Sequence, residues 1–354
     1  MNADLTFENL REMMLYAMNG KVDVTEKIDG INYRFKVTEV VHSLGGGKFY
    51  SLSEYSERGV FDSNILDVME GMYNGVYGYL QKHYAGCMIE CELILPSSPN
   101  VVMYAFKKPT IVIRKIVDLT TGNEFPVGDF IDNFDSLAVD VIEPPTIVFR
   151  SRSTLPEEQE YTKIVSYADS VISRCLHRHS LTATSTIGDY LYACALRVVR
   201  KEFGYSLSNR TEDLLCRRWA LNDKTTRLSG KSVGNGYLRK VKEMDKVARK
   251  LQDEWFFELY VMIARVGNYI ISRYDGYLND VSDVSLDDMI MRINSLIVDT
   301  QGNYKKAFAT RVISNSGMDS LSKCTEGVVF NFRESSYKFV GNFTWINQLV
   351  WSNK

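Results

Sequence analysis

The stretch Thr25-Glu26-Lys27-Ile28-Asp29-Gly30 decides how the rest of this chain is interpreted. It places a lysine two residues before an aspartate, followed at once by a turn glycine. A lysine whose ammonium loses its proton through burial and nearby charge can attack the α-phosphate of a nucleoside triphosphate and hold the nucleotide as a phosphoramidate. We therefore predict that Lys27 is a nucleophile. A strand that ends in a turn is the alternative for the same letters.

Further short stretches follow Lys27 at spacings that let several strands converge on one pocket. Arg58 lies after a predicted hairpin and supplies a guanidinium, and Glu92 lies on a predicted strand and supplies a carboxylate. The stretches are Ser56-Glu57-Arg58-Gly59, Ile89-Glu90-Cys91-Glu92-Leu93-Ile94, Ile116-Val117-Asp118-Leu119, Glu326-Gly327-Val328-Val329-Phe330 and Ser336-Tyr337-Lys338-Phe339.

Taken in order, these stretches resemble the covalent nucleotidyltransferase superfamily of ATP-dependent polynucleotide ligases and capping enzymes, and within it the phage-type RNA ligases. The family pattern is Lys-x-Asp-Gly, an Arg-containing Ser-Arg-x-Gly-like element, Gly-Glu-Leu, an apolar-Asp strand, Glu-Gly-hydrophobic-Val and a Lys-x-Lys strand. The separations from Lys27 to Glu92 and from Glu326 to Lys338 are similar to those of RNA ligases.

The chain departs from the family pattern at three places. Ile31 stands where Ser or Thr often follows the motif glycine, and Cys91 replaces the glycine before the glutamate. The last stretch holds one lysine, Lys338, where the family has two, so one phosphate contact is open and Arg333 or another basic residue is the alternative source.

The resemblance implies a metal-dependent reaction with ATP. Lys27 would carry the lysyl-AMP intermediate, Asp29 would orient the lysine or help to bind metal, and Glu326 would bind the metal, which is Mg²⁺ or Mn²⁺. These groups neutralise and position a triphosphate. A turn aspartate is the alternative for Asp29, and an exposed strand position is the alternative for Glu326.

The remaining contacts implied by the resemblance hold the nucleotide itself. Arg58 would contact phosphate or ribose, Glu92 a ribose hydroxyl, and Lys338 the α-phosphate, while Glu26 would read the base edge through its backbone. The Ile116-Val117 strand would form part of the adenine slot or pack in the core.

These residues predict an ATP-dependent RNA ligase that joins 5′-phosphate and 3′-hydroxyl ends through lysyl-AMP and an adenylylated end. RNA is the preferred nucleic acid over DNA, and the protein is expected to be a monomer. One alternative is a DNA or mixed nick-sealing ligase. Another is a catalytically degenerate protein of the same fold that binds nucleic acid.

Composition sets the frame around this site. The chain has 354 residues, of which 45% are hydrophobic, enough for one large core or two smaller ones. No apolar run reaches the roughly 20 residues of a membrane helix, and the N-terminus does not resemble a signal peptide, so we expect a cytoplasmic protein without a membrane partner. The six cysteines lack paired spacing, and the stretch from Cys175 to His179 lacks the second half of a zinc site.

Charge is distributed unevenly along the chain. The net charge is −2, but residues 197–250 hold 15 Lys and Arg against 6 Asp and Glu. Such a block is either the solvated face of long helices or a surface that contacts nucleic acid phosphates. We expect the second, with Arg239, Lys240 and Lys242 as its representative residues.

Periodicity predicts an α+β fold, with a mostly antiparallel nucleotidyltransferase (ATP-grasp-like ligase) core, a large all-helical insertion and no OB-fold domain. The first part of the core is residues 1–150, with helices at 7–18 and 63–83 and strands at 22–27, 32–41, 48–55, 88–95, 101–106 and 110–117. The helical accessory domain is residues 151–317, with helices at 157–179, 186–203, 212–220, 236–273, 285–299 and 303–314. The last strands of the core, 327–333 and 336–340, lie in residues 318–354.

Overall fold

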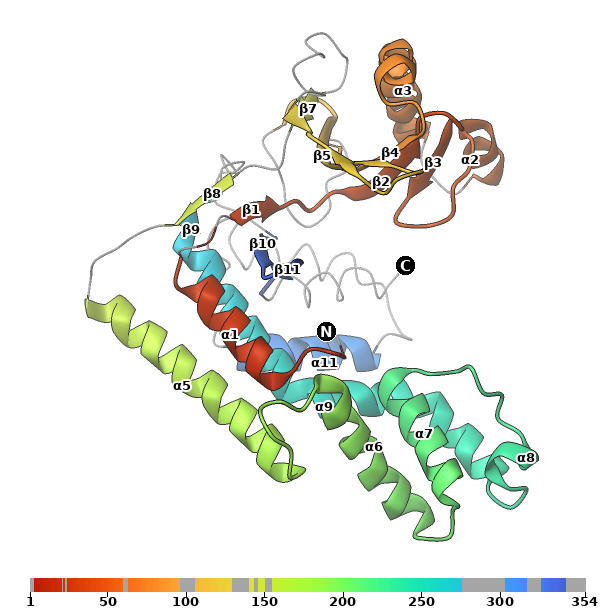
Figure 1. The fold of residues 1–354 in the computed structure, drawn as a ribbon, viewed down its shortest axis with the longest axis vertical. Coiled ribbons are helices and arrows are strands. Elements are labelled where there is room, and N and C mark those ends of the chain that lie inside the picture. The colour runs from red at the N-terminus through yellow and green to blue at the C-terminus, as the bar shows by residue number, and fades with distance from the viewer. Residues whose placement is uncertain are drawn as a thin grey trace. The chain divides into compact units, whose positions relative to one another are not determined.

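The computed structural model describes residues 3–20, 22, 24–59, 63–95, 106–128, 140–142, 146–149, 155–275, 303–316 and 326–341. These residues form helices and mostly antiparallel sheets (Figure 1), which confirms the mixed α and antiparallel β character. Their contacts divide the chain into two units. The helical unit comprises Met1–Val22, Ser151–Tyr269 and Ala307–Met318, and the sheet unit comprises Asp23–Arg150, Ile270–Lys306 and Asp319–Lys354.

The helical unit contains the N-terminal helix, which the sequence analysis assigned to the sheet core. Helix α1 (Phe7–Met18) begins with hydrogen bonds from Phe7 N to Ser185 O and from Glu8 N to Ala183 O. Arg11 forms a two-pronged ion pair with Asp169, at 2.6 and 3.0 Å. These contacts bind α1 to helices far along the sequence. The insertion itself and the absence of an OB-fold stay predictions.

The other helices of this unit match the predicted helical segments closely. Their apolar faces bury large side chains such as Tyr190 and Trp219. The predicted helix at 285–299 lies outside the described residues. The helices are α5 (Leu155–Arg178), α6 (Ile187–Phe203), α7 (Asn209–Leu221), α8 (Gly230–Val233), α9 (Leu238–Arg273) and α11 (Asn303–Asn315), of which the ends of α9 and α11 extend into the sheet unit.

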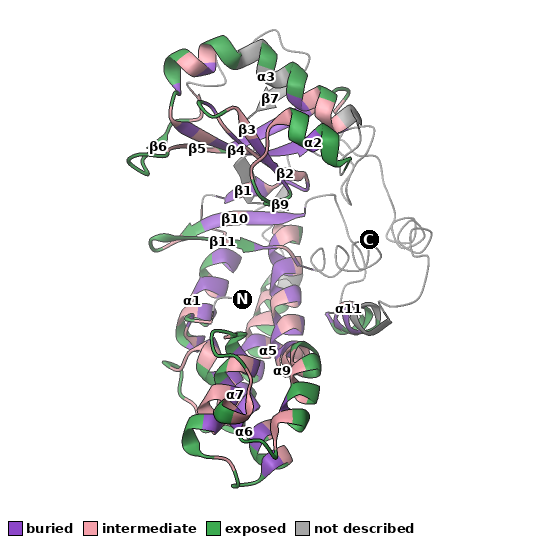
Figure 2. Cartoon of the chain, turned by 90° about the vertical axis from the view of Figure 1, so that its right-hand side faces the viewer, coloured by how far each residue is buried: buried purple, intermediate pink, exposed green. Residues whose placement is uncertain are grey.

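The first sheet of the sheet unit joins strands from both ends of the sequence. Its order is β11-β10-β1-β8-β9. Strand β1 pairs with β10 so that Lys27 lies opposite Gly327, and β10 pairs with β11 so that Val329 lies opposite Lys338. Gly327, Val328 and Phe330 of β10 are buried (purple in Figure 2). The strands are β1 (Val24–Lys27), β8 (Thr146–Phe149), β9 (Tyr274–Asp275), β10 (Gly327–Phe332) and β11 (Ser335–Phe339).

The second sheet has the order β3-β2-β4-β5-β6, and β7 pairs with β5. Alternate residues of its strands, among them Tyr33, Phe35 and Ile89, pack with Met69 and Leu80 of helix α3 (Ser63–His83) into one buried core. The strands are β2 (Ile31–Lys36), β3 (Val41–Leu44), β4 (Cys87–Ile94), β5 (Thr110–Asp118), β6 (Glu124–Phe125) and β7 (Asp140–Ile142).

Cys91, which stands where the family pattern has glycine, belongs to this core. Its side chain is fully buried, and its thiol donates to the carbonyl oxygen of Tyr33 at 3.2 Å. The side chain of Cys91 therefore packs in the core beside the second sheet, at a position where glycine would have no side chain.

The strand predicted at 48–55 is wrong. Residues Leu52–Arg58 form helix α2, because Ser51 caps the backbone of Glu54 and Glu54 reaches back to the backbone of Ser51. Gly59 ends the helix in the left-handed conformation, at φ 58°.

Most of the predicted strand at 101–106 lies outside the described residues. In the described part of the chain, no helix is long and apolar enough to cross a membrane.

Two motif glycines are required by close approach of neighbouring strands. A Cβ at Gly30 would lie 2.9 Å from the Cβ of Glu92, and a Cβ at Gly327 would lie 2.2 Å from the carbonyl oxygen of Phe339. Only hydrogen fits at either place. The two glycines therefore allow β2 to approach β4 and β10 to approach β11.

We predict that Gly327→Ala lowers the free energy of unfolding by about 1–3 kcal/mol, because the added methyl group meets backbone that cannot rotate away. The matched control is Gly78→Ala in helix α3, where nothing lies within 4 Å of the added carbon. Alanine there should leave stability unchanged or raise it by up to about 1 kcal/mol. Urea unfolding of both variants measures the difference, and equal stability of the two would contradict the close contact at Gly327.

Candidate active site

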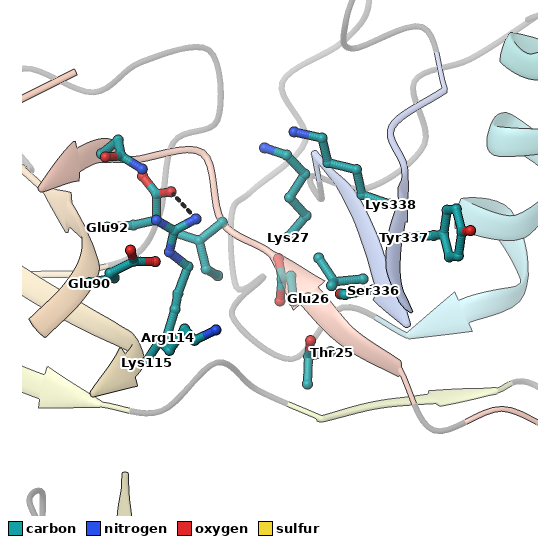
Figure 3. Close-up of a pocket in the computed structure, with 13 residues that line it drawn as sticks. Thr25, Glu26, Lys27, Glu90, Glu92, Arg114, Lys115, Ser336, Tyr337 and Lys338 are labelled. Carbon is teal, nitrogen blue, oxygen red and sulfur yellow. Dashed lines mark ion pairs between the residues drawn. The ribbon is translucent and has the colours of Figure 1, made fainter. Parts of the chain in front are cut away.

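A cavity of about 590 Å³ lies between the two sheets of the sheet unit (Figure 3). It is within the size range of small-molecule sites. Strands β1, β10 and β11 supply one wall, and β2, β4 and β5 supply the other. The lining residues are Thr25, Glu26, Lys27, Ile28, Asn32, Glu90, Glu92, Arg114, Lys115, Val329, Ser336, Tyr337 and Lys338.

Lys27 reaches this cavity because the chain changes sheet immediately after it. Strand β1 ends at Lys27 in the first sheet, and β2 begins at Ile31 in the second. The link of three residues contains Asp29, which is 7% exposed, and the close-packed Gly30. The Lys-x-Asp-Gly stretch is therefore the hinge between the two walls, and it holds the lysine at their junction.

Lys27 forms an ion pair with Glu326. Its Nζ donates to Oε2 of Glu326, a residue that directly precedes Gly327, the partner of Lys27 across the sheet. Glu326 is 6% exposed, and this burial raises the pKa of its carboxyl group against the opposing charge of Lys27. The ammonium compensates a buried carboxylate that would otherwise be costly.

Lys338 adds a second ammonium to the same wall. Lys338 and Ser336 alternate along β11, so both face the cavity beside Val329 of β10. Figure 3 shows the Lys27 and Lys338 side chains extending in a similar direction. The charge of Lys338 also opposes the rise in the Glu326 pKa, which places the two groups within electrostatic reach. Two ammonium groups so arranged suit a phosphate group between them.

Glu92 occupies the opposite wall and is held by Arg114. Nη1 of Arg114 lies 3.1 Å from Oε1 of Glu92. Burial raises the pKa of Glu92 to about 7, although Arg114 and then Lys27 oppose this rise. The charges of Glu326 and Asp29 add to it. Glu92 therefore changes charge near neutral pH, which is unusual for a carboxyl group and typical of functional sites.

Arg114 owes its position to a β-bulge that the sequence analysis missed. Glu90 pairs with Lys115, but Cys91 pairs with Ile113, so Arg114 is an extra residue on β5. A bulge of this kind redirects side chains, and here two consecutive residues, Arg114 and Lys115, both line the cavity. The available signal was the adjacent pair of charges inside an otherwise apolar strand, Ile111 to Val117.

Asn32 is a second lining residue that was missed. It lies opposite Glu92 in the pairing of β2 with β4. Its Oδ1 is buried and has no hydrogen-bond partner among the described residues. A bound ligand that donates an N–H or O–H group would satisfy this atom, because a buried acceptor without a partner costs stability.

Four of the predicted nucleotide-binding residues, Glu26, Lys27, Glu92 and Lys338, line the cavity together. Arg58 does not line it: this residue ends helix α2, where its guanidinium lies 4.0 Å from the centroid of the Tyr50 ring. Ile116 is fully buried in the core of the second sheet.

Arg333 cannot take the place of the missing second lysine from its position in the hairpin. It lies in the turn between β10 and β11, at the other end of this pair from Lys338, with φ 56°. Its guanidinium lies 5.1 Å from the centroid of the Phe332 ring.

The predicted nucleic-acid-binding residues lie in the helical unit, on helix α9. Arg239 pairs with Glu243 at 3.2 Å, and Lys240 pairs with Glu202 at 3.1 Å. Lys242 is exposed. Two of the three charges are thus partly compensated by carboxylates of their own unit.

The carboxylates near Lys27 fit a magnesium ion that also binds phosphate. In the described part of the chain, no group of three or more His, Cys, Asp or Glu side chains is placed to hold a metal ion. Mg²⁺ usually takes one or two carboxylates together with substrate phosphates and water. Asp29 and Glu326, whose charges influence one another, fit that smaller protein contribution.

We predict that Arg114→Met raises the pKa of Glu92 above about 7, because it removes the largest interaction that opposes the effect of burial. Lys115→Met is the matched control, since Lys115 is the next residue of the same strand and pairs with Glu124. Carbon-13 NMR titration of glutamate-labelled protein, with Glu92→Gln to assign the signal, measures the shift. An unchanged Glu92 pKa in Arg114→Met would show that the ion pair does not persist in solution.

Comparison with known proteins gives little beyond this geometry. No family model and no curated protein matches the chain. Two solved structures match, named archaeal ATP-dependent RNA ligase form 1 and form 2, at 11% and 12% identity. Each match covers 98% of this chain and 80% of the other, with a TM-score of 0.26. Overlap this low carries no argument about function, so any functional conclusion depends on the residues of the cavity.

Proposed function

We propose that the protein is an ATP-dependent RNA ligase that joins 5′-phosphate and 3′-hydroxyl ends. The observation that carries the proposal is the convergence of Lys27, Glu326 and Lys338 across three paired strands, opposite Glu92 and Arg114. A lysine at the mouth of a cavity with a second cation and buried carboxylates suits covalent capture of a nucleotide.

In the first step, the Lys27 amine attacks the α-phosphorus of ATP. A P–N bond forms, the bond to the bridging oxygen breaks, and pyrophosphate leaves. The ammonium must first transfer a proton, and Oε2 of Glu326, which accepts the hydrogen bond from Nζ, is placed to receive it. Lys338 stabilises the charge on the α-phosphate. Mg²⁺ or Mn²⁺ at Asp29 and Glu326 would supply further positive charge for the triphosphate.

The opposite wall holds the nucleoside. Ionised Glu92 accepts a hydrogen bond from a ribose hydroxyl, and Arg114 keeps it ionised and oriented. Asn32 accepts a hydrogen bond from the same ligand through its buried Oδ1. Because burial raises the pKa of Glu92 to about 7, nucleotide binding should weaken as the pH falls through that value.

Two further transfers complete the reaction at the same site. The 5′-phosphate oxygen of one end attacks the lysyl-AMP phosphorus, which restores the Lys27 amine and gives an end capped by AMP. The 3′-hydroxyl of the other end then attacks the capped phosphate, a phosphodiester forms, and AMP leaves. RNA is the proposed substrate of a monomeric enzyme, and parallel assays with DNA ends test the nick-sealing alternative.

We predict that the protein becomes covalently labelled by α-labelled ATP and that Lys27→Arg abolishes labelling. Arginine keeps the positive charge beside Glu326 but does not lose its proton at working pH. Lys36→Arg is the control, because Lys36 lies on neighbouring β2 and pairs with Glu39. A denaturing gel gives the measurement, and α-labelled GTP in parallel tests the nucleotide. Labelling that survives in Lys27→Arg would place the nucleophile elsewhere.

We also predict that Glu326→Gln and Lys338→Met each slow labelling by about 10²-fold or more, since each removes charge that acts on the transferred phosphate. Arg333→Met is the control for Lys338→Met, because it removes one positive charge from the turn of the same hairpin. Single-turnover rates of labelling separate these variants. Similar losses in Lys338→Met and Arg333→Met would mean that net charge, and not the place of Lys338, is responsible.

A further inference from the structure

A second cavity, of about 300 Å³, lies within the helical unit. Its volume is at the lower end of the range for small-molecule sites. The end of α5, one face of α6 and one face of α9 form its walls. The residues used below are Arg178 at the end of α5, His179 directly after it, Cys194, Arg197 and Lys201 of α6, and Trp255 of α9.

The walls of this second cavity are fixed by direct contacts. Cys194, Arg197 and Lys201 follow one another at helical spacings of three and four residues, so they share one face of α6. Tyr190 Oη donates to the carbonyl oxygen of Trp255 at 2.9 Å. This bond joins α6 to α9 beside the cavity, which both residues line.

The carboxylates of the cavity are already compensated. Glu254 pairs with Arg311 at 2.6 Å. Glu258 pairs with Arg174 at 3.4 Å and with Arg178 at 3.3 Å. Their negative charges therefore do not cancel those of the basic residues on α6.

Arg197 and Lys201 supply the excess positive charge. Arg197 donates to the carbonyl oxygen of Arg178 at 3.2 Å, a contact that leaves its charge uncompensated. Within the described ranges, no carboxylate lies within ion-pair distance of Arg197 or Lys201. Both side chains are exposed at the cavity. Their charge attracts an anion.

The pKa of His179 is affected by the positive charges of this cavity. Its Nε2 lies 3.4 Å from Sγ of Cys194. Burial lowers the pKa of the imidazole, and the charges of Arg197 and Arg178 lower it further. An anion bound between these groups would oppose that effect and raise the pKa.

Aromatic residues also contribute to the lining. Trp255 and Phe257 both contribute, and the guanidinium of Arg311 lies 3.9 Å from the centroid of the Phe257 ring. A basic wall beside an aromatic surface is the usual arrangement for unpaired nucleotides, because cations hold the phosphate and a ring stacks on the base.

We propose that this cavity binds one nucleotide of single-stranded polynucleotide, with a phosphate between Arg197 and Lys201 and the base against Trp255. The inference rests on the proposed ligase function for the nature of the polymer and deepens it by giving the helical unit a site for the strand. It favours this cavity over the Arg239, Lys240 and Lys242 surface, where two charges already pair with carboxylates.

The test measures binding of a short 5′-phosphorylated RNA oligonucleotide to the full chain by fluorescence anisotropy and by quenching of tryptophan emission. Trp255→Phe identifies the part of the quenching that comes from the cavity. The variant R197Q/K201Q should weaken binding at least tenfold and reduce the slope of log K against log salt by about 0.7, because the contact to one phosphate is lost.

The control variant is K163Q/K246Q, which removes the same charge from exposed positions on α5 and α9. It should change affinity much less than R197Q/K201Q. NMR titration of the four histidines should show that the pKa of His179 rises when the oligonucleotide binds. Equal weakening by the two double variants, or an unchanged His179 pKa, would overturn the proposal.

Two further experiments are needed. One distinguishes an oligonucleotide from small phosphate-containing ligands, and the other distinguishes failure of this inference from failure of the proposed ligase function. AMP and inorganic phosphate should bind more weakly than the oligonucleotide, and equal binding would make this a site for small anions, against the inference. Oligonucleotide binding that depends on Arg197 and Lys201 in a protein that never forms lysyl-AMP would support this inference and refute the ligase. Normal lysyl-AMP formation without Trp255 quenching would refute this inference alone.

Discussion

The ion pair between Lys27 and Glu326 is the interaction on which the site depends. It joins residues 299 positions apart, and it does so because β1 and β10 are neighbours in one sheet. The glycine after Glu326 lets β11 approach closely enough to place Lys338 on the same wall. Each partner compensates the other in a partly buried place where either charge alone would be costly. The proposed reaction depends on this ion pair, because Lys27 must lose a proton before it attacks and Glu326 accepts a hydrogen bond from its ammonium.

The two buried glutamates of the site differ because their partners differ. Glu326 faces a lysine that the proposed chemistry converts to a neutral amine, whereas Glu92 faces an arginine that stays charged. Burial raises both pKa values, and Glu92 reaches about 7. In the proposed function, Glu326 belongs to the wall that holds the nucleophile, and Glu92 belongs to a nucleoside-binding wall whose charge depends on pH. The close approach at Gly30 fixes the hinge that joins these walls.

Helices and strands that depend on short-range sequence patterns could be predicted from the sequence. The helices at Phe7–Met18 and Ser63–His83 have the predicted bounds. The strands that hold Lys27, Glu92 and Lys338, and the strand that begins directly after Glu326, form close to where they were predicted. The sequence also contains the capping signal Ser51-x-x-Glu54, which the prediction of a strand at 48–55 did not take into account. The adjacent charges of Arg114 and Lys115 were the local sign of the bulge, whereas the grouping of α1 with distant helices depends on partners across the fold, which no local pattern encodes. The roles of individual site residues remain proposals.

The measurement that tests the central claim most directly is peptide mapping by mass spectrometry after incubation with ATP and Mg²⁺. The account predicts one adenylyl group on the peptide that contains Lys27, bonded through nitrogen and therefore labile in acid and stable in base. An adenylyl group on any other residue, or none under conditions in which the protein joins RNA ends, would contradict it.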